Sequence, residues 1–243
     1  MKKVALLPSL FTTGNLFCGI YAIILALNGQ YAGSGRFIVI AIIFDCLDGQ
    51  IARFKKMVTQ FGFEYDSLAD LISFGVAPAL LLYMVTLKGL GRIGSVLFFT
   101  YIACTALRLA RFNSQKITQH KPDFAGLPAP AAGGFIASIF ILNYRYPCPL
   151  LVKLTPIIMF IMAVLMVSAW RYPAMGTFNL WKKKPFLTLV TVILCGTVAF
   201  LQLELFLFFC FLGYVLFGIL GRKWVAVSLM EKSVTERSDH GVV

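Results

Sequence analysis

The sequence predicts an all-α protein that crosses a membrane several times. Only 13% of its 243 residues are charged and 59% are hydrophobic, whereas soluble domains carry about 25% charged residues. The mean hydropathy is +0.85. Apolar stretches of roughly 20 residues, the length that a helix needs to span a bilayer, recur along most of the chain.

We expect eight membrane helices, at residues 6–28, 34–53, 66–87, 93–112, 128–144, 150–170, 185–201 and 204–221. The first follows Lys2 and Lys3 as in a signal peptide, but its apolar run reaches Leu27 and no A-x-A cleavage site follows, so we interpret it as a membrane helix. The fifth, rich in Gly, Pro and Ala, is the least regular. The last two share one apolar run, and a single long tilted helix is the alternative. Residues 1–227 then form one transmembrane domain, and 228–243 form a polar C-terminal tail.

The distribution of positive charge supports an even number of helices with both termini in the cytoplasm. Cytoplasmic segments of membrane proteins are enriched in Lys and Arg. This topology places all but five of the 22 lysines and arginines on the cytoplasmic side, the exceptions being Arg36, Lys88, Arg92, Arg145 and Lys153. The loop between the second and third helices is therefore expected in the cytoplasm.

Composition also excludes several kinds of site. The six cysteines are scattered singly and only two histidines, His120 and His240, are present. A zinc or haem site built on thiolate or imidazole ligands is therefore not expected. The net charge of +12 fits membrane topology and anionic headgroups better than nucleic acid, because no basic soluble domain is visible.

An acidic cluster interrupts the apolar sequence. Five of the ten acidic residues lie between positions 45 and 70. A carboxylate at the centre of a membrane helix costs roughly 3 kcal/mol on insertion scales, so these groups must face something polar or positive. Residues three or four apart share a helix face, so Asp45, Asp48, Gly49 and Ala52 form one stripe, and Asp66, Ala69, Asp70 and Ser73 form another.

The two stripes belong to antiparallel neighbours and can face each other near the cytoplasmic surface. Two carboxylates 4 Å apart repel by roughly 4 kcal/mol at an effective dielectric constant of 20. The charge of four ionised aspartates, Asp45, Asp48, Asp66 and Asp70, would therefore be balanced by about two divalent cations. All-oxygen ligands suit Mg²⁺, Mn²⁺ or Ca²⁺, and metal pairs of this kind assist phosphoryl displacement. The alternatives are neutralisation by Lys and Arg from other helices, or a cation pathway such as that of a divalent-cation transporter.

The pattern D-x2-D-G-x2-A-R-x8-G-x3-D-x3-D runs from Asp45 to Asp70 without departure. It resembles the signature of the CDP-alcohol phosphatidyltransferases. The resemblance implies a six-helix core, with two further helices at the C-terminus here, and a two-metal enzyme that displaces CMP from a CDP-linked lipid. It implies that Asp45, Asp48, Asp66 and Asp70 serve two Mg²⁺ or Mn²⁺ ions and that Asp70 is the catalytic base. It also implies that the CDP part is contacted by Gly49, Ala52, Arg53 and Gly62.

Further stretches are similar to the bacterial membrane-integral phosphatidylserine synthases. They are Asn15–Gly19, Asp66–Asp70 with Ser73–Pro78, Leu107–Asn113 and Phe124–Pro128. This likeness implies transfer of the phosphatidyl group from CDP-diacylglycerol to the hydroxyl of L-serine. It also implies an inner-membrane enzyme with a cytoplasmic active site and a homodimer. Inositol phosphate or glycerol phosphate as acceptor is the alternative within the family.

The acceptor site is expected near the cytoplasmic end of the fourth helix. Arg108 and Arg111 share a helix face there, and together with Asn113 they could hold either the carboxylate of serine or a phosphate of the donor. Arginines at a cytoplasmic helix end are also expected from topology alone. Thr12 and Asn15, in the first helix, are candidates for contact with the cytidine.

Overall fold

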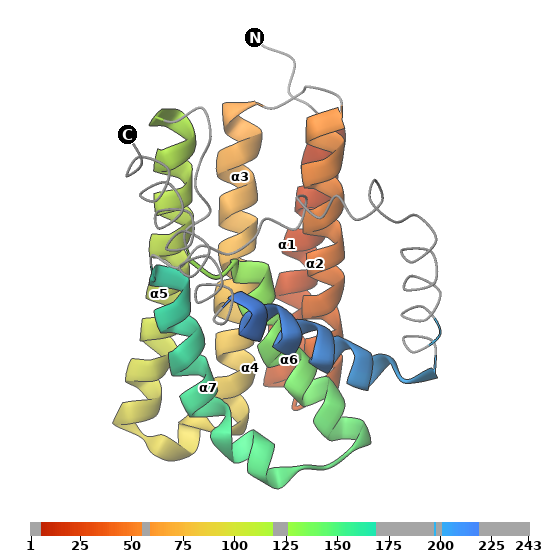
Figure 1. Cartoon of the computed structure of the whole chain (residues 1–243), viewed down its shortest axis with the longest axis vertical. Helices are drawn as coiled ribbons and strands as arrows, with labels where there is room; N and C mark the ends of the chain where they lie inside the picture. Colours follow the sequence, from red (N-terminus) through yellow and green to blue (C-terminus); the bar gives the residue numbers. More distant parts are fainter. Residues whose placement is uncertain (1–5, 55–58, 119–125, 169–196, 198–200, 219–243) are drawn as a thin grey trace, which may run out of the picture.

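The computed structural model describes residues 6–54, 59–118, 126–168, 197 and 201–218, and every regular element in this part of the chain is a helix. In chain order these elements are α1 (Leu6–Leu27), α2 (Tyr31–Phe54), α3 (Gln60–Asp70), the π-helix η1 (Leu71–Val76), α4 (Ala77–Val85), the 3₁₀-helix η2 (Leu87–Leu90), α5 (Arg92–Thr118), α6 (Ala129–Arg145) and α7 (Pro149–Val167). A further helix, Leu203–Gly218, follows and is drawn in blue without a label in Figure 1.

The predicted all-helical class is confirmed, but the count of eight membrane helices is not. Within the described residues, four helices are long and apolar enough to cross a membrane: Ser9–Leu27, Gln60–Val85, Arg92–Ser114 and Pro149–Val167. Helix α2 has the length but carries Arg36, Asp45 and Asp48, and α6 has 17 residues. The predicted segment 185–201 and the C-terminal tail lie almost wholly outside the described residues.

The third predicted helix begins earlier than expected, at Gln60 instead of residue 66. Thr59 caps it, because the Thr59 hydroxyl accepts a hydrogen bond from the backbone N–H of Gly62 over 3.1 Å. This first part of the helix includes the polar residues Gln60 and Glu64, so its hydropathy did not predict that the helix begins here. Asp66 therefore lies well inside a helix and not at its start.

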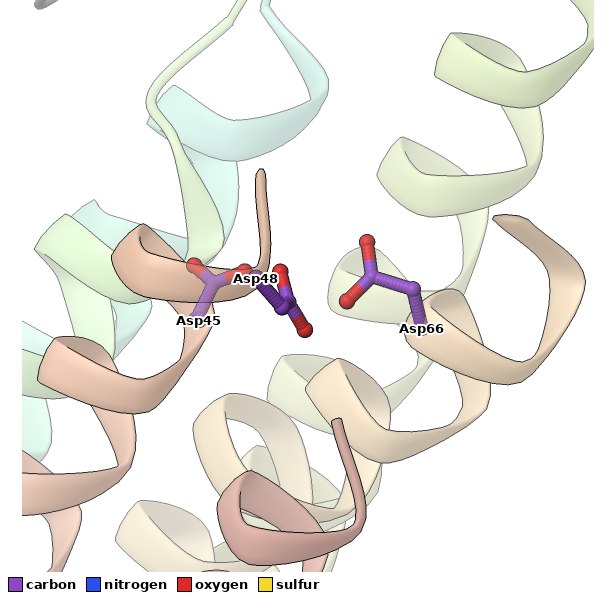
Figure 2. A group of neighbouring side chains, drawn as sticks. All are labelled: Asp45, Asp48 and Asp66. Atoms are coloured by element: carbon purple, nitrogen blue, oxygen red, sulfur yellow. The ribbon is translucent and has the colours of Figure 1, made fainter. Parts of the chain in front are cut away.

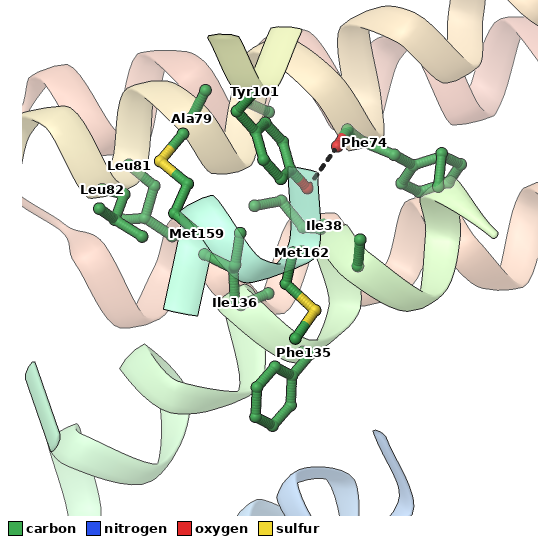
Figure 3. Close-up of a cluster of buried hydrophobic side chains, with 14 of the residues drawn as sticks. Ile38, Phe74, Ala79, Leu81, Leu82, Tyr101, Phe135, Ile136, Met159 and Met162 are labelled. Carbon is green, nitrogen blue, oxygen red and sulfur yellow. Dashed lines mark hydrogen bonds between the residues drawn. The ribbon is translucent and has the colours of Figure 1, made fainter. Parts of the chain in front are cut away.

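Helices α1, α2, α5 and the continuous α3–η1–α4 rod run along the long axis of the molecule, whereas α6 and Leu203–Gly218 cross them obliquely (Figure 1). Helix α6 lies at the centre, and its residues from Ala131 to Leu142 are all buried. Figure 3 shows Phe135 and Ile136 of α6 packed with Met159 and Met162 of α7 near Phe74 and Tyr101. This core holds the elements that carry the acidic residues.

The π-helix η1 begins directly after Asp70 and ends two residues before Pro78. Pro78 has no backbone N–H, so it cannot bond the carbonyl of Phe74 four residues earlier. The buried hydroxyl of Tyr101, on α5, donates to that carbonyl instead, over 3.2 Å (Figure 3). A short π-helix inside an α-helix is often found at a functional site, and here it shifts the direction of every side chain that follows Asp70.

Small residues let the helices around η1 approach closely. A methyl group at Gly19 of α1 would lie 2.8 Å from the Cα atom of Ser73, and one at Gly133 of α6 would lie 3.2 Å from the Cα atom of Phe74. The outward faces of the bundle carry large exposed apolar side chains, such as Phe17, Phe99 and Ile157. That distribution fits a protein surrounded by lipid.

Candidate active and metal site

Three carboxylates gather between α2 and α3. Asp45 and Asp48 project from α2 and Asp66 from α3 (Figure 2), and each offers an oxygen that lies within 4.8 Å of the other two. The helical spacing predicted from the sequence therefore brings these three residues together as expected. Their separation is small enough for one cation to be bound by all three side chains.

Helix α1 closes this cluster from one side. The hydroxyl of Thr12 donates a 2.9 Å hydrogen bond to the carboxylate of Asp48, and both residues are buried, Asp48 being 5% exposed. A charge-assisted hydrogen bond of this kind fixes the rotamer of the carboxylate. Thr12 was expected near the cytidine, and the structure gives it a direct contact with a proposed metal ligand.

Asp70 lies one helical turn beyond Asp66 and is 8% exposed. The side-chain amide of Asn15 donates to its carboxylate over 3.0 Å, and the hydroxyl of Ser73 donates to the backbone carbonyl of Asn15 over 3.0 Å. Asn15 is fully buried, and its Oδ1 atom has no hydrogen-bond partner among the described residues. Asp70 is not one of the three clustered ligands, but its charge interacts with those of all three.

The chemistry of this donor set fits divalent cations. Three carboxylates within 4.8 Å of one another repel strongly when ionised and must gain protons or cations. Carboxylate and amide oxygens are hard ligands that suit Mg²⁺ or Mn²⁺. The unsatisfied, buried Oδ1 of Asn15 adds an acceptor beside Asp70 that a bound group could use. Asp45, Asp48 and Asp66 would hold the metal, with Asp70 next to them.

The basic residues expected at the acceptor site have different environments. Arg108 on α5 is partly buried, and its charge interacts with Asp70 and Asp45. Arg111, one turn later, is exposed. The structure therefore brings Arg108 into the surroundings of the aspartates, and the role of Arg111 stays a prediction.

Asn113, on α5, makes its hydrogen bonds to residues of α3. Its amide donates to Ser67 over 3.0 Å and to Glu64 over 3.3 Å. These residues belong to a groove of about 430 Å³ between α3 and α5, lined by Glu64, Ser67, Leu68, Leu71, Ala106, Leu109, Ala110 and Asn113. Asn113 lies two residues after Arg111 in the sequence but its hydrogen bonds go to α3, and its role beside the arginines in the acceptor site stays a prediction.

The residues expected to contact CDP lie at the same end of α2 and α3. Gly49 is partly buried directly after Asp48, and Gly62 belongs to the first turn of α3. Ala52 and Arg53 belong to the last turn of α2, but their side chains lie outside the described part of the chain. Sequence reasoning missed Tyr214, whose side chain interacts electrostatically with Arg108; a single tyrosine in an apolar run gave no signal.

Comparison with known proteins agrees with the geometry. A family model described as CDP-alcohol phosphatidyltransferase matches residues 5–170. A CDP-diacylglycerol–serine O-phosphatidyltransferase of Helicobacter pylori is 35% identical over 227 residues, which cover 93% of each chain. A protein of the same name from Methanocaldococcus jannaschii is 32% identical over 90% of this chain and 96% of its own length. Another, from Bacillus subtilis, is 38% identical over 69% of this chain and 89% of its own length.

Proposed function

This chain belongs to the CDP-alcohol phosphatidyltransferase family, and we propose that it transfers the phosphatidyl group of CDP-diacylglycerol to the hydroxyl of L-serine, releasing CMP. The observation that carries the site assignment is the convergence of Asp45, Asp48 and Asp66 within 4.8 Å, with buried Asp70 beside them. The choice of serine is supported by three relatives of that activity at 32–38% identity.

The chain's own residues supply a positioned base. A serine hydroxyl is a weak nucleophile and needs a group that removes its proton. Asp70 takes that proton while the serine oxygen bonds to the phosphorus of the phosphatidyl group. The bond from this phosphorus to the bridging oxygen of CMP breaks, and CMP leaves. Asn15, predicted as a CDP contact, also holds the Asp70 carboxylate in place through its 3.0 Å hydrogen bond.

Two divalent cations, Mg²⁺ or Mn²⁺, would neutralise the carboxylates and stabilise negative charge that develops on the leaving phosphate. Asp45, Asp48 and Asp66 are suited to hold them, with Asp70 as a further ligand. Gly49, Ala52, Arg53 and Gly62 would receive the CDP part, since small residues let a ligand approach the backbone and a guanidinium suits phosphate.

The membrane placement is part of this proposal. The cytoplasmic membrane of a bacterium is the expected location, with the aspartates and both termini on the cytoplasmic side, where most Lys and Arg lie. The lipid bilayer is one partner, and a homodimer is expected from the family resemblance.

A direct test compares acceptors on purified protein in detergent–lipid micelles. CDP-diacylglycerol is supplied with radiolabelled L-serine, inositol phosphate or glycerol phosphate in parallel, with Mg²⁺ or Mn²⁺. We expect labelled lipid and stoichiometric CMP with serine alone. Turnover with inositol phosphate or glycerol phosphate instead would change the acceptor but keep the chemistry of the family. Flux of divalent cations into proteoliposomes, without transfer of the phosphatidyl group, would favour a transporter.

A further inference from the structure

The helix Leu203–Gly218 packs against the centre of the bundle, although it lies beyond the residues 5–170 that the family model matches. The rings of Phe208 and Phe135 stack with centroids 5.7 Å apart. Phe211 sits directly on Gly134 of α6, where a methyl group would collide with its ring. The blue helix is thereby fixed across α6 (Figure 1).

The same contact involves α2, the helix that carries Asp45 and Asp48. A methyl group at Gly134 would also lie 2.7 Å from Cδ1 of Ile42 on α2, so Phe211 and Ile42 meet at one point of α6. One turn further along their helices lie Tyr214 and Asp45. Tyr214 is partly buried and packs against the core, and Val215 next to it is 3% exposed.

Arg108, on α5, is partly buried, and its charge interacts with those of Asp70 and Asp45 and with Tyr214. A partly buried guanidinium that interacts with a phenol can bind an anion together with it, because both groups are hydrogen-bond donors. In L-serine the carboxylate and the reacting hydroxyl are separated by only two carbon atoms, so the groups that bind them must be neighbours.

This inference rests on the proposed function. We propose that the hydroxyl of Tyr214 and the guanidinium of Arg108 together bind the carboxylate of L-serine, with the serine hydroxyl directed toward Asp70. The helix Leu203–Gly218 thus completes the acceptor site from outside the motif-bearing part of the chain. The donor diphosphate is the other anion that Arg108 could meet, and the experiment separates the two.

The test uses Tyr214→Phe, which removes one hydroxyl and keeps the ring. A hydrogen bond to a charged group contributes about 1.5–3 kcal/mol, so the KM for serine should rise about tenfold or more. The kcat and the KM for CDP-diacylglycerol should stay within about twofold of the full-length wild type. Inhibition by serinol, in which a hydroxymethyl group replaces the carboxylate, should be unchanged.

Tyr144→Phe is the matched control, because Tyr144 is 72% exposed near the C-terminal end of α6 and should leave all constants unchanged. Thermal unfolding of both variants checks their folding. An unchanged serine KM in Tyr214→Phe, or an equal rise in the KM for CDP-diacylglycerol, would overturn the role of Tyr214. Absence of serine turnover in the wild type would instead contradict the proposed function, and this assignment with it.

Discussion

The amide of Asn15 donates a 3.0 Å hydrogen bond to the carboxylate of Asp70, and it joins α1 to the last residue of α3. Both side chains are buried. A carboxylate with one fixed hydrogen bond keeps its remaining lone pairs pointing in defined directions. This bond therefore fixes the orientation of the carboxylate that we propose as the base.

Asn15→Ala should lower kcat by about 10- to 100-fold, because a hydrogen bond to a charged group contributes about 1.5–3 kcal/mol. Steady-state kinetics with CDP-diacylglycerol and serine measure this. Asn143→Ala is the matched control, since the Asn143 side chain, near the end of α6, accepts a 2.9 Å hydrogen bond from the backbone N–H of Cys148 in the loop that follows. Equal kcat values in the two variants would remove Asn15 from the support of Asp70.

Asp70→Asn should abolish turnover and retain donor binding. Loss of a general base costs about 10²–10⁴ in rate, whereas the amide has the same shape and can still accept from Asn15. Single-turnover CMP release measures the chemistry, and equilibrium binding of CDP-diacylglycerol measures the donor site. Near-normal turnover in Asp70→Asn would show that another group takes the proton.

Asp66→Asn should weaken metal binding as well as activity. Removing one of three clustered carboxylates removes a charged ligand, and we expect the Mn²⁺ dissociation constant, measured by electron paramagnetic resonance, to rise at least about tenfold, or 1.4 kcal/mol. Glu64→Gln is the control, because Glu64 lies two residues away on α3 but is exposed and bonded to Asn113. EDTA should stop turnover, and Mg²⁺ or Mn²⁺ should restore it. Full activity in metal-free protein would contradict the metal site.

Helical periodicity was enough to group Asp45, Asp48 and Asp66, because their relation depends on residues three or four apart and on one short connection. The partners of those carboxylates were not predictable in the same way. Thr12 and Asn15 reach Asp48 and Asp70 across 36 and 55 positions, and these contacts depend on how α1 packs against α2 and α3. No local pattern encodes that packing.

Other features depended on tertiary context that the sequence pattern does not reveal. The π-helix after Asp70 contains the carbonyl of Phe74, which accepts a hydrogen bond from Tyr101 of another helix. Asn113 lies five residues after Arg108, so the two point to different sides of α5, and only the structure shows Ser67 and Glu64 as its partners. Phe211, one turn before Tyr214, packs on Gly134, and no local pattern predicts that contact between distant helices.

Gly49→Leu should weaken the binding of CDP-diacylglycerol and leave metal binding unchanged. Gly49 lies four residues after Asp45 and therefore on the same face of α2, where a leucine side chain would fill the space proposed for CDP. We expect at least about tenfold weaker binding of CDP-diacylglycerol, about 1.4 kcal/mol, with unchanged Mn²⁺ affinity. Gly89→Leu is the control, since nothing lies within 4 Å of a methyl group at Gly89. Unchanged donor affinity would show that Gly49 serves helix packing instead.

Tyr101→Phe should destabilise the fold without removing any group from the site. The Tyr101 hydroxyl is the donor to the Phe74 carbonyl, at 3.2 Å, and the ring is fully buried, so phenylalanine fills the same space. Because Pro78 cannot supply an N–H, the carbonyl would lose the donor that replaces it, and a buried acceptor that loses its partner costs about 1–3 kcal/mol. Thermal unfolding in detergent should show a lower midpoint for Tyr101→Phe than for Tyr144→Phe, whose hydroxyl is exposed. Equal midpoints would mean that the π-helix satisfies this carbonyl in another way, and the link between Tyr101 and the segment after Asp70 would fail.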